Sequence, residues 1–143
     1  MNAAGYYAQQ VGDWFKPYGG RTVPMMVMSH QYLLSEEIPE IEQYTKTSGK
    51  KLPLLRDVDV SYYLRQEKNG FNLGPYEPNC KAHWATEDDP MPDDFSFQLW
   101  NDDLDRIEDI VSDAMERVPL LGTSGVSRVT VSYTHLRAHE THL

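Results

Sequence analysis

The sequence predicts an α+β fold, a β-sheet with flanking helices, and three observations favour it. Residues 60–67 and 71–77 are β-forming runs joined by Lys68-Asn69-Gly70. Asn-Gly between two such runs is the strongest short signal for a hairpin. Residues 23–35 form a longer run of apolar and β-forming types, and residues 104–118 carry apolar positions at helical spacing. The chain has 143 residues, enough for one ordinary domain.

Further segments are expected to precede the hairpin. Residues 1–5 are expected to end a strand at a glycine turn, and residues 6–15 to form a short helix that Lys16-Pro17 stops. Such a turn between a strand and a helix lets a nucleotide approach backbone N–H groups. A surface excursion is expected over residues 36–51, because two acids and a proline lead into polar residues and lysines. A short strand is expected over residues 52–56.

A long loop, an acidic helix and an unpatterned tail are expected after the hairpin. Residues 78–100 contain prolines and many acids, which favours a loop. Asn101 is expected to cap the following helix, since acids in its first turn suit the helix dipole. The apolar stripe of this helix consists of Leu104, Ile107, Ile110, Val111, Ala114, Met115 and Val118. Pro119 ends the helix, residues 122–125 are expected as a loop, and residues 132–143 show neither helical nor strand patterning.

The charge of the chain is concentrated in one stretch. The net charge is −9, yet residues 87–117 contain twelve acids and only two bases, Arg106 and Arg117. Such a stretch repels phosphate backbones, so a nucleic-acid partner is not expected. A solvated acidic face is the simpler interpretation, because Asp102, Asp103 and Asp105 lack calcium-loop spacing and the glycine of that turn. No membrane-spanning run and no signal peptide is found, and Cys80 alone favours a reducing compartment.

Four blocks of sequence carry a resemblance to a known family. They are NAAGYYAQQVG (2–12), PMMVMSHQYLLSEEIPE (24–40), LPLLRDVDVSYYLRQEKNGFNLGPYEPN (52–79) and PDDFSFQLWNDDLDRIEDIVSDAMERVPLL (92–121). In order and spacing these blocks resemble the FAD-dependent dimethylglycine and sarcosine dehydrogenases, flavoproteins of the D-amino-acid-oxidase type. The resemblance covers about residues 2–129.

The resemblance implies a central piece of such a flavoprotein. Residues 1–20 would end a segment of the FAD-binding domain, and residues 21–130 would form the substrate domain with its mixed β-sheet and acidic helix. Residues 131–143 depart from the family and resemble translated sequencing-adapter DNA, a recurrent artefact of metagenome assemblies, so we expect a non-native tail. The chain contains no G-x-G-x-x-G turn for the FAD pyrophosphate. We therefore expect the isolated chain neither to bind FAD nor to be active.

The resemblance also implies roles for small and aromatic residues near the start of the chain. Ala4 and Gly5 would lie against FAD, because small residues let a backbone approach a dinucleotide closely. Tyr7 follows them as a further cofactor contact. From the residues alone, an ordinary tight turn is the simpler interpretation.

Three polar residues are implied as the substrate site. His30 would face the flavin and substrate and tune the amine, since hydride loss requires a neutral amine; a buried core histidine is the alternative. Tyr63 matches the family's active-site tyrosine, whose phenol would bind the substrate carboxylate or take the amine proton. Tyr62 points to the opposite face of a strand, where it would pack. Arg65 shares the face of Tyr63 and would bind the carboxylate or form a structural ion pair, and both remain open.

No metal site is expected. Cys80 and His83 form a C-x2-H pair without the third or fourth ligand that a metal requires. His135, His139 and His142 have a zinc-like spacing, but they lie in the tail that we expect to be non-native.

The resulting hypothesis is a fragment of an oxidoreductase that oxidises N-methyl amino acids by hydride transfer to FAD. The resemblance implies an N-methyl amine substrate, with oxygen or an acceptor flavoprotein as electron acceptor and no nucleic-acid or membrane partner. The resemblance also implies tetrahydrofolate as a ligand of the full-length parent, outside this chain. The expected location is the bacterial cytoplasm or the mitochondrial matrix. The alternatives are a non-catalytic relative acting as a regulatory or binding subunit, and a free-standing small binding domain.

Overall fold

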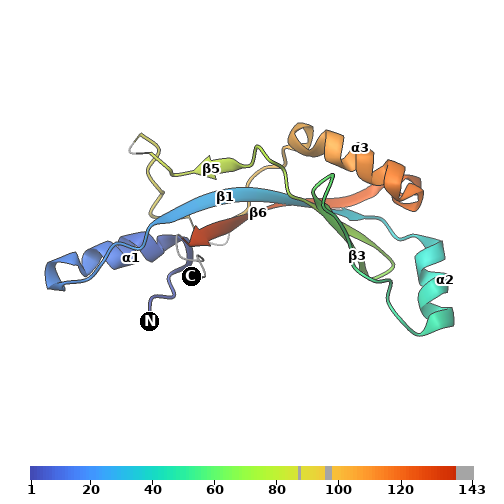
Figure 1. The fold of residues 1–143 in the computed structure, drawn as a ribbon, viewed down its shortest axis with the longest axis horizontal. Helices are drawn as coiled ribbons and strands as arrows, with labels where there is room; N and C mark the ends of the chain where they lie inside the picture. Colours follow the sequence, from blue (N-terminus) through green and yellow to red (C-terminus); the bar gives the residue numbers. More distant parts are fainter. Residues whose placement is uncertain (87, 96–97, 138–143) are drawn as a thin grey trace. The chain divides into compact units, whose positions relative to one another are not determined.

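The computed structural model describes residues 1–86, 88–95 and 98–137, and of residues 132–137 only the backbone. The chain divides into two compact units (Figure 1). The first comprises residues 1–29, 81–98 and 133–143, and the second comprises residues 30–80 and 99–132. The fold class is α+β, as predicted. None of the helices in the described part of the chain is long and apolar enough to cross a membrane.

The first unit begins with a turn, where we expected the end of a strand. Residues 1–4 have no regular structure, and the short helix η1 (Gly5–Tyr7) leads into α1 (Ala8–Trp14) and η2 (Lys16–Tyr18). The side chain of Asn2 explains the turn, because its Oδ1 accepts from the Ala4 N–H at 3.2 Å and its Nδ2 donates to the Ala8 carbonyl at 2.7 Å. Local bonds of this kind compete with strand formation. The predicted helix over 6–15 is confirmed as η1 followed by α1, which ends at Trp14.

Strand β1 (Met25–Ser35) runs through both units and confirms the long predicted strand. In the first unit, Val27 to Ser29 pair antiparallel with β5 (Lys81–His83). The expectation of a continuous loop over residues 78–100 is therefore wrong at β5. β1 pairs with β4 only near its end, so its earlier backbone groups can pair with another segment whatever the side chains of that segment are.

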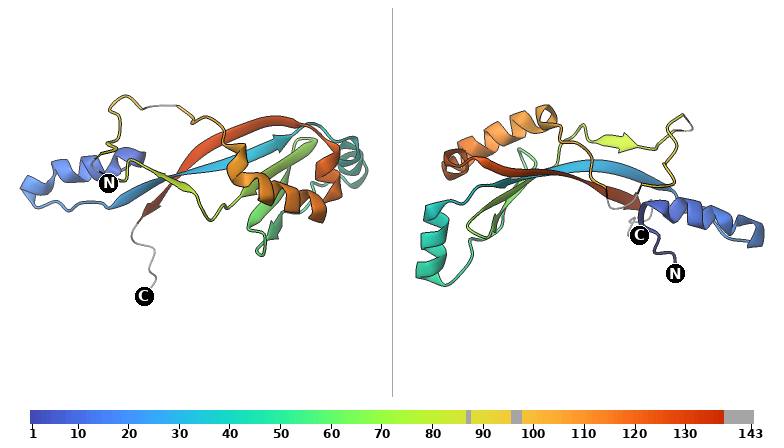
Figure 2. Two further views of the ribbon diagram at one scale, coloured as in Figure 1. Left: turned by 90° about the horizontal axis from the view of Figure 1, so that it is seen from above. Right: turned by 180° about the vertical axis from the view of Figure 1, so that it is seen from behind.

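The second unit contains an antiparallel sheet (Figure 2). Its strands β2 (Leu55–Asp57), β3 (Tyr62–Glu67) and β4 (Gly70–Pro75) lead to β1 in that order. The predicted β3–β4 hairpin is confirmed, but its two-residue turn is Lys68-Asn69, because Gly70 already belongs to β4 and pairs with Glu67. The pairings of β1 with β4 and β5, and of β3 with β2 and β4, are antiparallel, and the mixed sheet of the family's whole substrate domain stays a prediction.

The last strand contradicts the expectation of an unpatterned tail. Strand β6 (Val126–Arg137) pairs with β1, and its start is fixed where the Glu36 N–H donates to the Gly125 carbonyl at 2.8 Å. Ladder bonds involve the backbone, so a strand can form without alternating side chains. Residues 138–143 lie outside the described residues, and whether residues 131–143 are native stays a prediction.

Two helices of the second unit correct the expected elements. Residues 36–51 contain α2 (Pro39–Ser48), because Pro39 suits the first helical turn and Gly49 ends the helix at φ 67°. The acidic helix comprises η3 (Leu104–Ile107) and α3 (Glu108–Arg117), followed by η4 (Pro119–Thr123) where a loop was expected at 122–125. Asn101 does not cap it: the backbone of Asp103 is bonded to the Gln31 side chain at 2.6 and 2.8 Å, and η3 begins there.

The core of the second unit lies between one sheet face and the helices. Figure 2 shows α3 over the sheet. The buried residues come from both helices and from alternate positions of the strands: Leu33, Ile38, Ile41, Tyr62, Leu64, Phe71, Leu73, Ala114 and Leu121. The predicted apolar stripe of α3 packs here through Ile110, Val111, Ala114 and Met115. Because strand side chains alternate, the intervening residues lie on the other sheet face.

Candidate functional site

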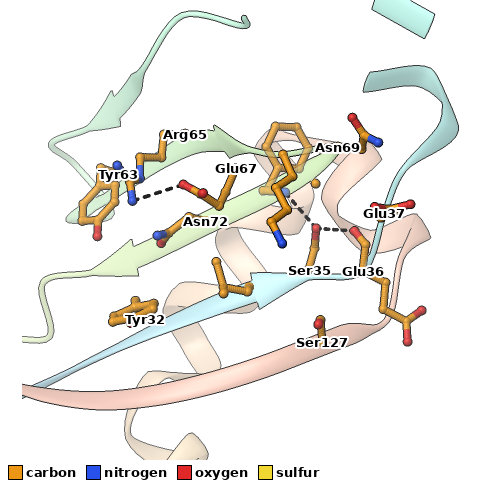
Figure 3. Close-up of a pocket in the computed structure, with 14 residues that line it drawn as sticks. Tyr32, Ser35, Glu36, Glu37, Tyr63, Arg65, Glu67, Asn69, Asn72 and Ser127 are labelled. Atoms are coloured by element: carbon orange, nitrogen blue, oxygen red, sulfur yellow. Dashed lines mark hydrogen bonds and ion pairs between the residues drawn. The ribbon is translucent and has the colours of Figure 1, made fainter. Parts of the chain in front are cut away.

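A cavity of about 580 Å³ lies over that other sheet face (Figure 3). Tyr32 and Ser35 of β1, Tyr63 and Arg65 of β3, and Asn72 of β4 contribute to its walls. The register explains why they meet, because Tyr63 pairs with Gly74 and Arg65 pairs with Asn72 across the hairpin. The structure therefore brings two predicted site residues, Tyr63 and Arg65, to one cavity.

Tyr63 is held by its neighbours on the sheet. Tyr62 is fully buried in the core while Tyr63 lines the cavity, which confirms that they point to opposite faces. The ring of Tyr63 lies over Gly74, where a Cβ would overlap Cε1, Cζ and the hydroxyl oxygen. The ring of Tyr76 also lies beside it, with centroids 5.8 Å apart, and the Tyr76 hydroxyl accepts a hydrogen bond from Arg56 Nη2 at 2.7 Å. The phenol thus has a defined position.

Burial raises the pKa of both Tyr62 and Tyr63 above the ordinary value of 10.0. Below that value both phenols are protonated in the folded and unfolded chain. Above it the unfolded chain loses these protons first, so we expect the free energy of unfolding to fall as the pH rises beyond 10.0. Urea unfolding at a series of alkaline pH values would measure this slope. Tyr63→Phe should make the slope shallower, and a free energy that rises with pH would contradict the expectation.

Arg65 forms an exposed ion pair with Glu67, and a ligand carboxylate can take the place of Glu67 in this pair. Its Nη2 lies 3.4 Å from Glu67 Oε2, and the two side chains are 53% and 41% exposed. An exposed pair of this kind contributes about 0–1 kcal/mol. Lys68, Glu36 and Glu37 also line the cavity, so it presents both cationic and anionic groups. This suits a small zwitterion, which carries both charges.

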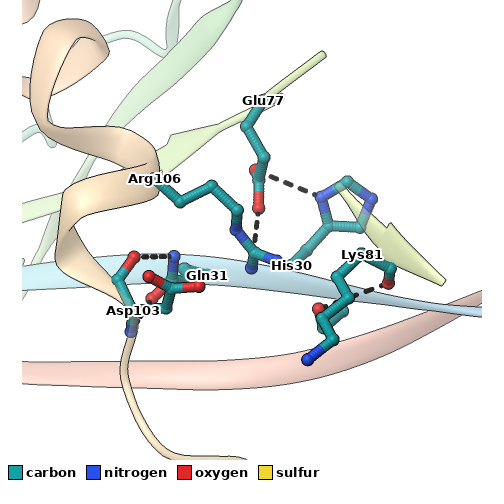
Figure 4. A network of polar contacts seen from close by, with 7 residues as sticks. His30, Gln31, Glu77, Lys81, Asp103 and Arg106 are labelled. Atoms are coloured by element: carbon teal, nitrogen blue, oxygen red, sulfur yellow. Dashed lines mark hydrogen bonds and ion pairs between the residues drawn. The ribbon is translucent and has the colours of Figure 1, made fainter. Parts of the chain in front are cut away.

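His30 contacts a carboxylate that the sequence did not indicate. His30 is not among the described residues that line the cavity, although it lies two residues before Tyr32 on β1. Its Nδ1 lies 3.4 Å from Oε2 of Glu77, and Oε1 of Glu77 lies 3.2 Å from Nη2 of Arg106 (Figure 4). The Glu77 side chain is 1% exposed. His30, whose side chain is 28% exposed, therefore belongs to a partly buried polar network.

The residues expected to contact FAD lie in the first unit. Gly5 is exposed, has φ +60°, and has open space where a Cβ would stand, so its backbone can be approached closely. Ala4 precedes it in the turn that Asn2 holds. The Tyr7 hydroxyl donates to carbonyls of the segment 92–95, at 3.0 Å to Pro92 and to Phe95. The backbone of this turn is therefore open at Gly5, and Tyr7 holds the neighbouring segment.

A metal centre finds no support in the described part of the chain. Among those residues no group of three or more histidine, cysteine, aspartate and glutamate side chains is placed to hold a metal ion. His139 and His142 lie outside the described residues, and of His135 only the backbone is described. The two cations of the acidic stretch, Arg106 and Arg117, pair with Glu77 and Asp57.

Sequence reasoning missed two residues of the site. Glu77 follows the Gly-Pro-Tyr block, and an isolated glutamate gives no signal that it will be buried beside a histidine and an arginine. Gly74 gives a weak signal, because a glycine within a strand often indicates that another group approaches closely. Here that group is the Tyr63 ring.

Two kinds of mitochondrial enzyme are similar to this chain, dimethylglycine dehydrogenase and sarcosine dehydrogenase. Mitochondrial dimethylglycine dehydrogenase of Mus musculus is 39% identical over 133 residues, which cover 90% of the chain and 14% of the enzyme. The Homo sapiens dimethylglycine dehydrogenase is 38% identical over the same shares. Mitochondrial sarcosine dehydrogenase of Mus musculus is 32% identical over 126 residues, 88% of the chain and 12% of the enzyme. No family model matches the chain.

Over these matched residues the chain belongs to the family of dimethylglycine and sarcosine dehydrogenases, which confirms the resemblance. The chain spans about one seventh of the length of the dimethylglycine dehydrogenases that it matches.

Proposed function

We propose that the chain is the part of an FAD-dependent N-methyl amino acid dehydrogenase that forms the substrate-binding sheet. The observation that carries this proposal is the cavity with Tyr63 and Arg65 on its walls, in a chain of this family. Dimethylglycine and sarcosine are the substrates named in the relatives. Each is a small zwitterion with a carboxylate and a methylated amine.

In this proposal Arg65 binds the substrate carboxylate. The guanidinium exchanges its weak contact with Glu67 for a charge-assisted bond to the substrate. Tyr63 donates its phenolic proton to the same carboxylate. Burial raises the pKa of Tyr63, so the phenol remains protonated at neutral pH and acts as a donor rather than as a base. Both residues orient the amine.

His30 then accepts the proton that the substrate ammonium must lose. An N-methyl ammonium cannot release hydride, so proton removal precedes oxidation to the iminium. His30 lies two residues from Tyr32 on β1, about 6–7 Å along the strand. FAD, when bound, supplies the hydride acceptor. Ala4, Gly5 and Tyr7 would contact it along the turn of the first unit.

A chimera tests the proposal. Residues 1–129 replace the matched segment of the Mus musculus dimethylglycine dehydrogenase, and bleaching of the flavin absorbance by dimethylglycine is measured. We expect bleaching, and a rate about 10²-fold lower in His30→Ala and in Tyr63→Phe, since each loses a proton contact. Arg65→Met should raise KM more than it lowers kcat, because it binds ground and transition states alike.

Arg117→Met is the matched control, because Arg117 is also an exposed arginine in a surface pair, 3.6 Å from Asp57. It should leave both constants unchanged. A chimera that retains flavin but is bleached by neither dimethylglycine nor sarcosine would contradict the proposal and favour a non-catalytic relative. On the chain itself, dimethylglycine should perturb the NMR signals of Tyr63 and Arg65, and their complete insensitivity would count against the cavity.

A further inference from the structure

A buried carboxylate lies beside His30 because of how β4 leaves the sheet. Leu33 pairs with Leu73 and Leu34 pairs with Asn72, so the same register continued would bring residues 76 and 77 beside residues 30 and 29. Strand β4 ends at Pro75, and the chain that follows carries Glu77 past this part of β1. Glu77 is 3% exposed, and a buried carboxylate requires a countercharge. Arg106 supplies it from η3.

Each oxygen of Glu77 has its own partner. Oε1 lies 3.2 Å from the guanidinium of Arg106, and Oε2 lies 3.4 Å from Nδ1 of His30 (Figure 4). A carboxylate only accepts hydrogen bonds and a guanidinium only donates them. The nitrogen of His30 that faces Glu77 therefore has to carry a proton. In the neutral ring this leaves the lone pair on Nε2, the nitrogen on the other side of the ring.

We infer that Glu77 is a positioning residue that fixes neutral His30 in the Nδ1–H form, with Nε2 as the proton acceptor. The tautomer is inferred from the contact between His30 and Glu77. The role of this tautomer in catalysis rests on the proposed function. Under that function, the substrate N–H bond breaks, its proton moves to Nε2, and the bonding pair stays on the amine nitrogen. Arg106 holds the Glu77 carboxylate in place through its guanidinium, which lies 3.2 Å from Oε1.

The variant Glu77→Gln gives a directional test. Glutamine has one accepting oxygen and one donating NH2 group. Arg106 cannot accept, so the amide oxygen has to face Arg106 and the NH2 group has to face His30. Nδ1 must then accept, and the neutral ring changes to the Nε2–H form. The substitution preserves the shape of the side chain, yet it removes the proton acceptor that the proposal requires.

The ring ¹⁵N signals of His30 in the full chain report the tautomer directly, at a pH where the ring is neutral. We expect Nδ1–H in the wild type and Nε2–H in Glu77→Gln. Glu67→Gln is the control, because Glu67 is an exposed carboxylate paired with Arg65, and it should leave the His30 signals unchanged. A wild-type ring in the Nε2–H form, or an unchanged tautomer in a folded Glu77→Gln, would overturn the inference. Backbone amide spectra establish whether Glu77→Gln is folded. If the variant unfolds, the tautomer of His30 in the wild type alone tests the inference.

The same variant in the chimera separates this inference from the proposed function. We expect Glu77→Gln to lower kcat by about 10²-fold and to change its pH profile, with KM nearly constant. A tautomer change in an inactive chimera would refute the proposed function and leave the positioning role intact. An active chimera whose His30 tautomer ignores Glu77→Gln would refute the positioning role alone.

Discussion

Tyr62→Ala is expected to lower the free energy of unfolding of the second unit by about 3–5 kcal/mol. Tyr62 is fully buried and belongs to the cluster that joins the sheet to α2 and α3. Removing its ring leaves a cavity that neighbouring side chains fill only in part, so both transfer free energy and packing are lost. A small domain has about 5–15 kcal/mol of stability in all, so this loss brings it close to unfolding.

Tyr63→Ala is the matched control, with the same residue type one position further along β3. Its side chain lies on the cavity face, so we expect a loss of about 1–2 kcal/mol. Urea unfolding measures both values. Equal losses for the two variants would contradict the assignment of the tyrosines to opposite faces. In the chimera the order should reverse, because Tyr63 contacts substrate under the proposed function and Tyr62 does not.

Local signals in the sequence were sufficient for the hairpin and for the apolar stripe of α3. The turn signal at residues 68–70 and the helical spacing act over a few residues, and they produce the hairpin, with its turn at Lys68-Asn69, and the helix α3. Residues 36–51 were misread because polar residues and lysines indicate a loop. The helix α2 instead depends on burying Ile41 in the core, which no local pattern shows.

In the candidate site too, the features set by local sequence were predicted and those set by distant pairing were not. That Tyr63 and Arg65 share a sheet face follows from the period of two in a strand, and the structure bears it out. The contact between His30 and Glu77 could not be predicted from the sequence, because it depends on the register between β1 and β4. Strand β6 was missed for a related reason, since its pairing with β1 uses backbone groups that the side chains do not encode.

Gly74→Ala is expected to displace the ring of Tyr63. A Cβ at position 74 would overlap three atoms of that ring, including the hydroxyl oxygen, so the side chain has to leave its rotamer. Forcing extra volume into such a contact costs about 1–3 kcal/mol. The displaced phenol loses the burial that raises its pKa, so the pKa of Tyr63 should move back toward 10.0.

Ultraviolet titration measures this pKa, with the contribution of Tyr63 isolated from the nine tyrosines as the difference between Gly74→Ala and Gly74→Ala/Tyr63→Phe. Gly122→Ala is the control, because its Cβ would meet the Met115 side chain at an ordinary 3.7 Å. Unchanged stability and an unchanged Tyr63 titration in Gly74→Ala would show that the ring does not lie over Gly74. In the chimera, Gly74→Ala should match the loss of activity of Tyr63→Phe while the phenol is still present. Such a match would show that activity requires the hydroxyl at its native position. Tyr63→Phe shows only that activity requires a hydroxyl.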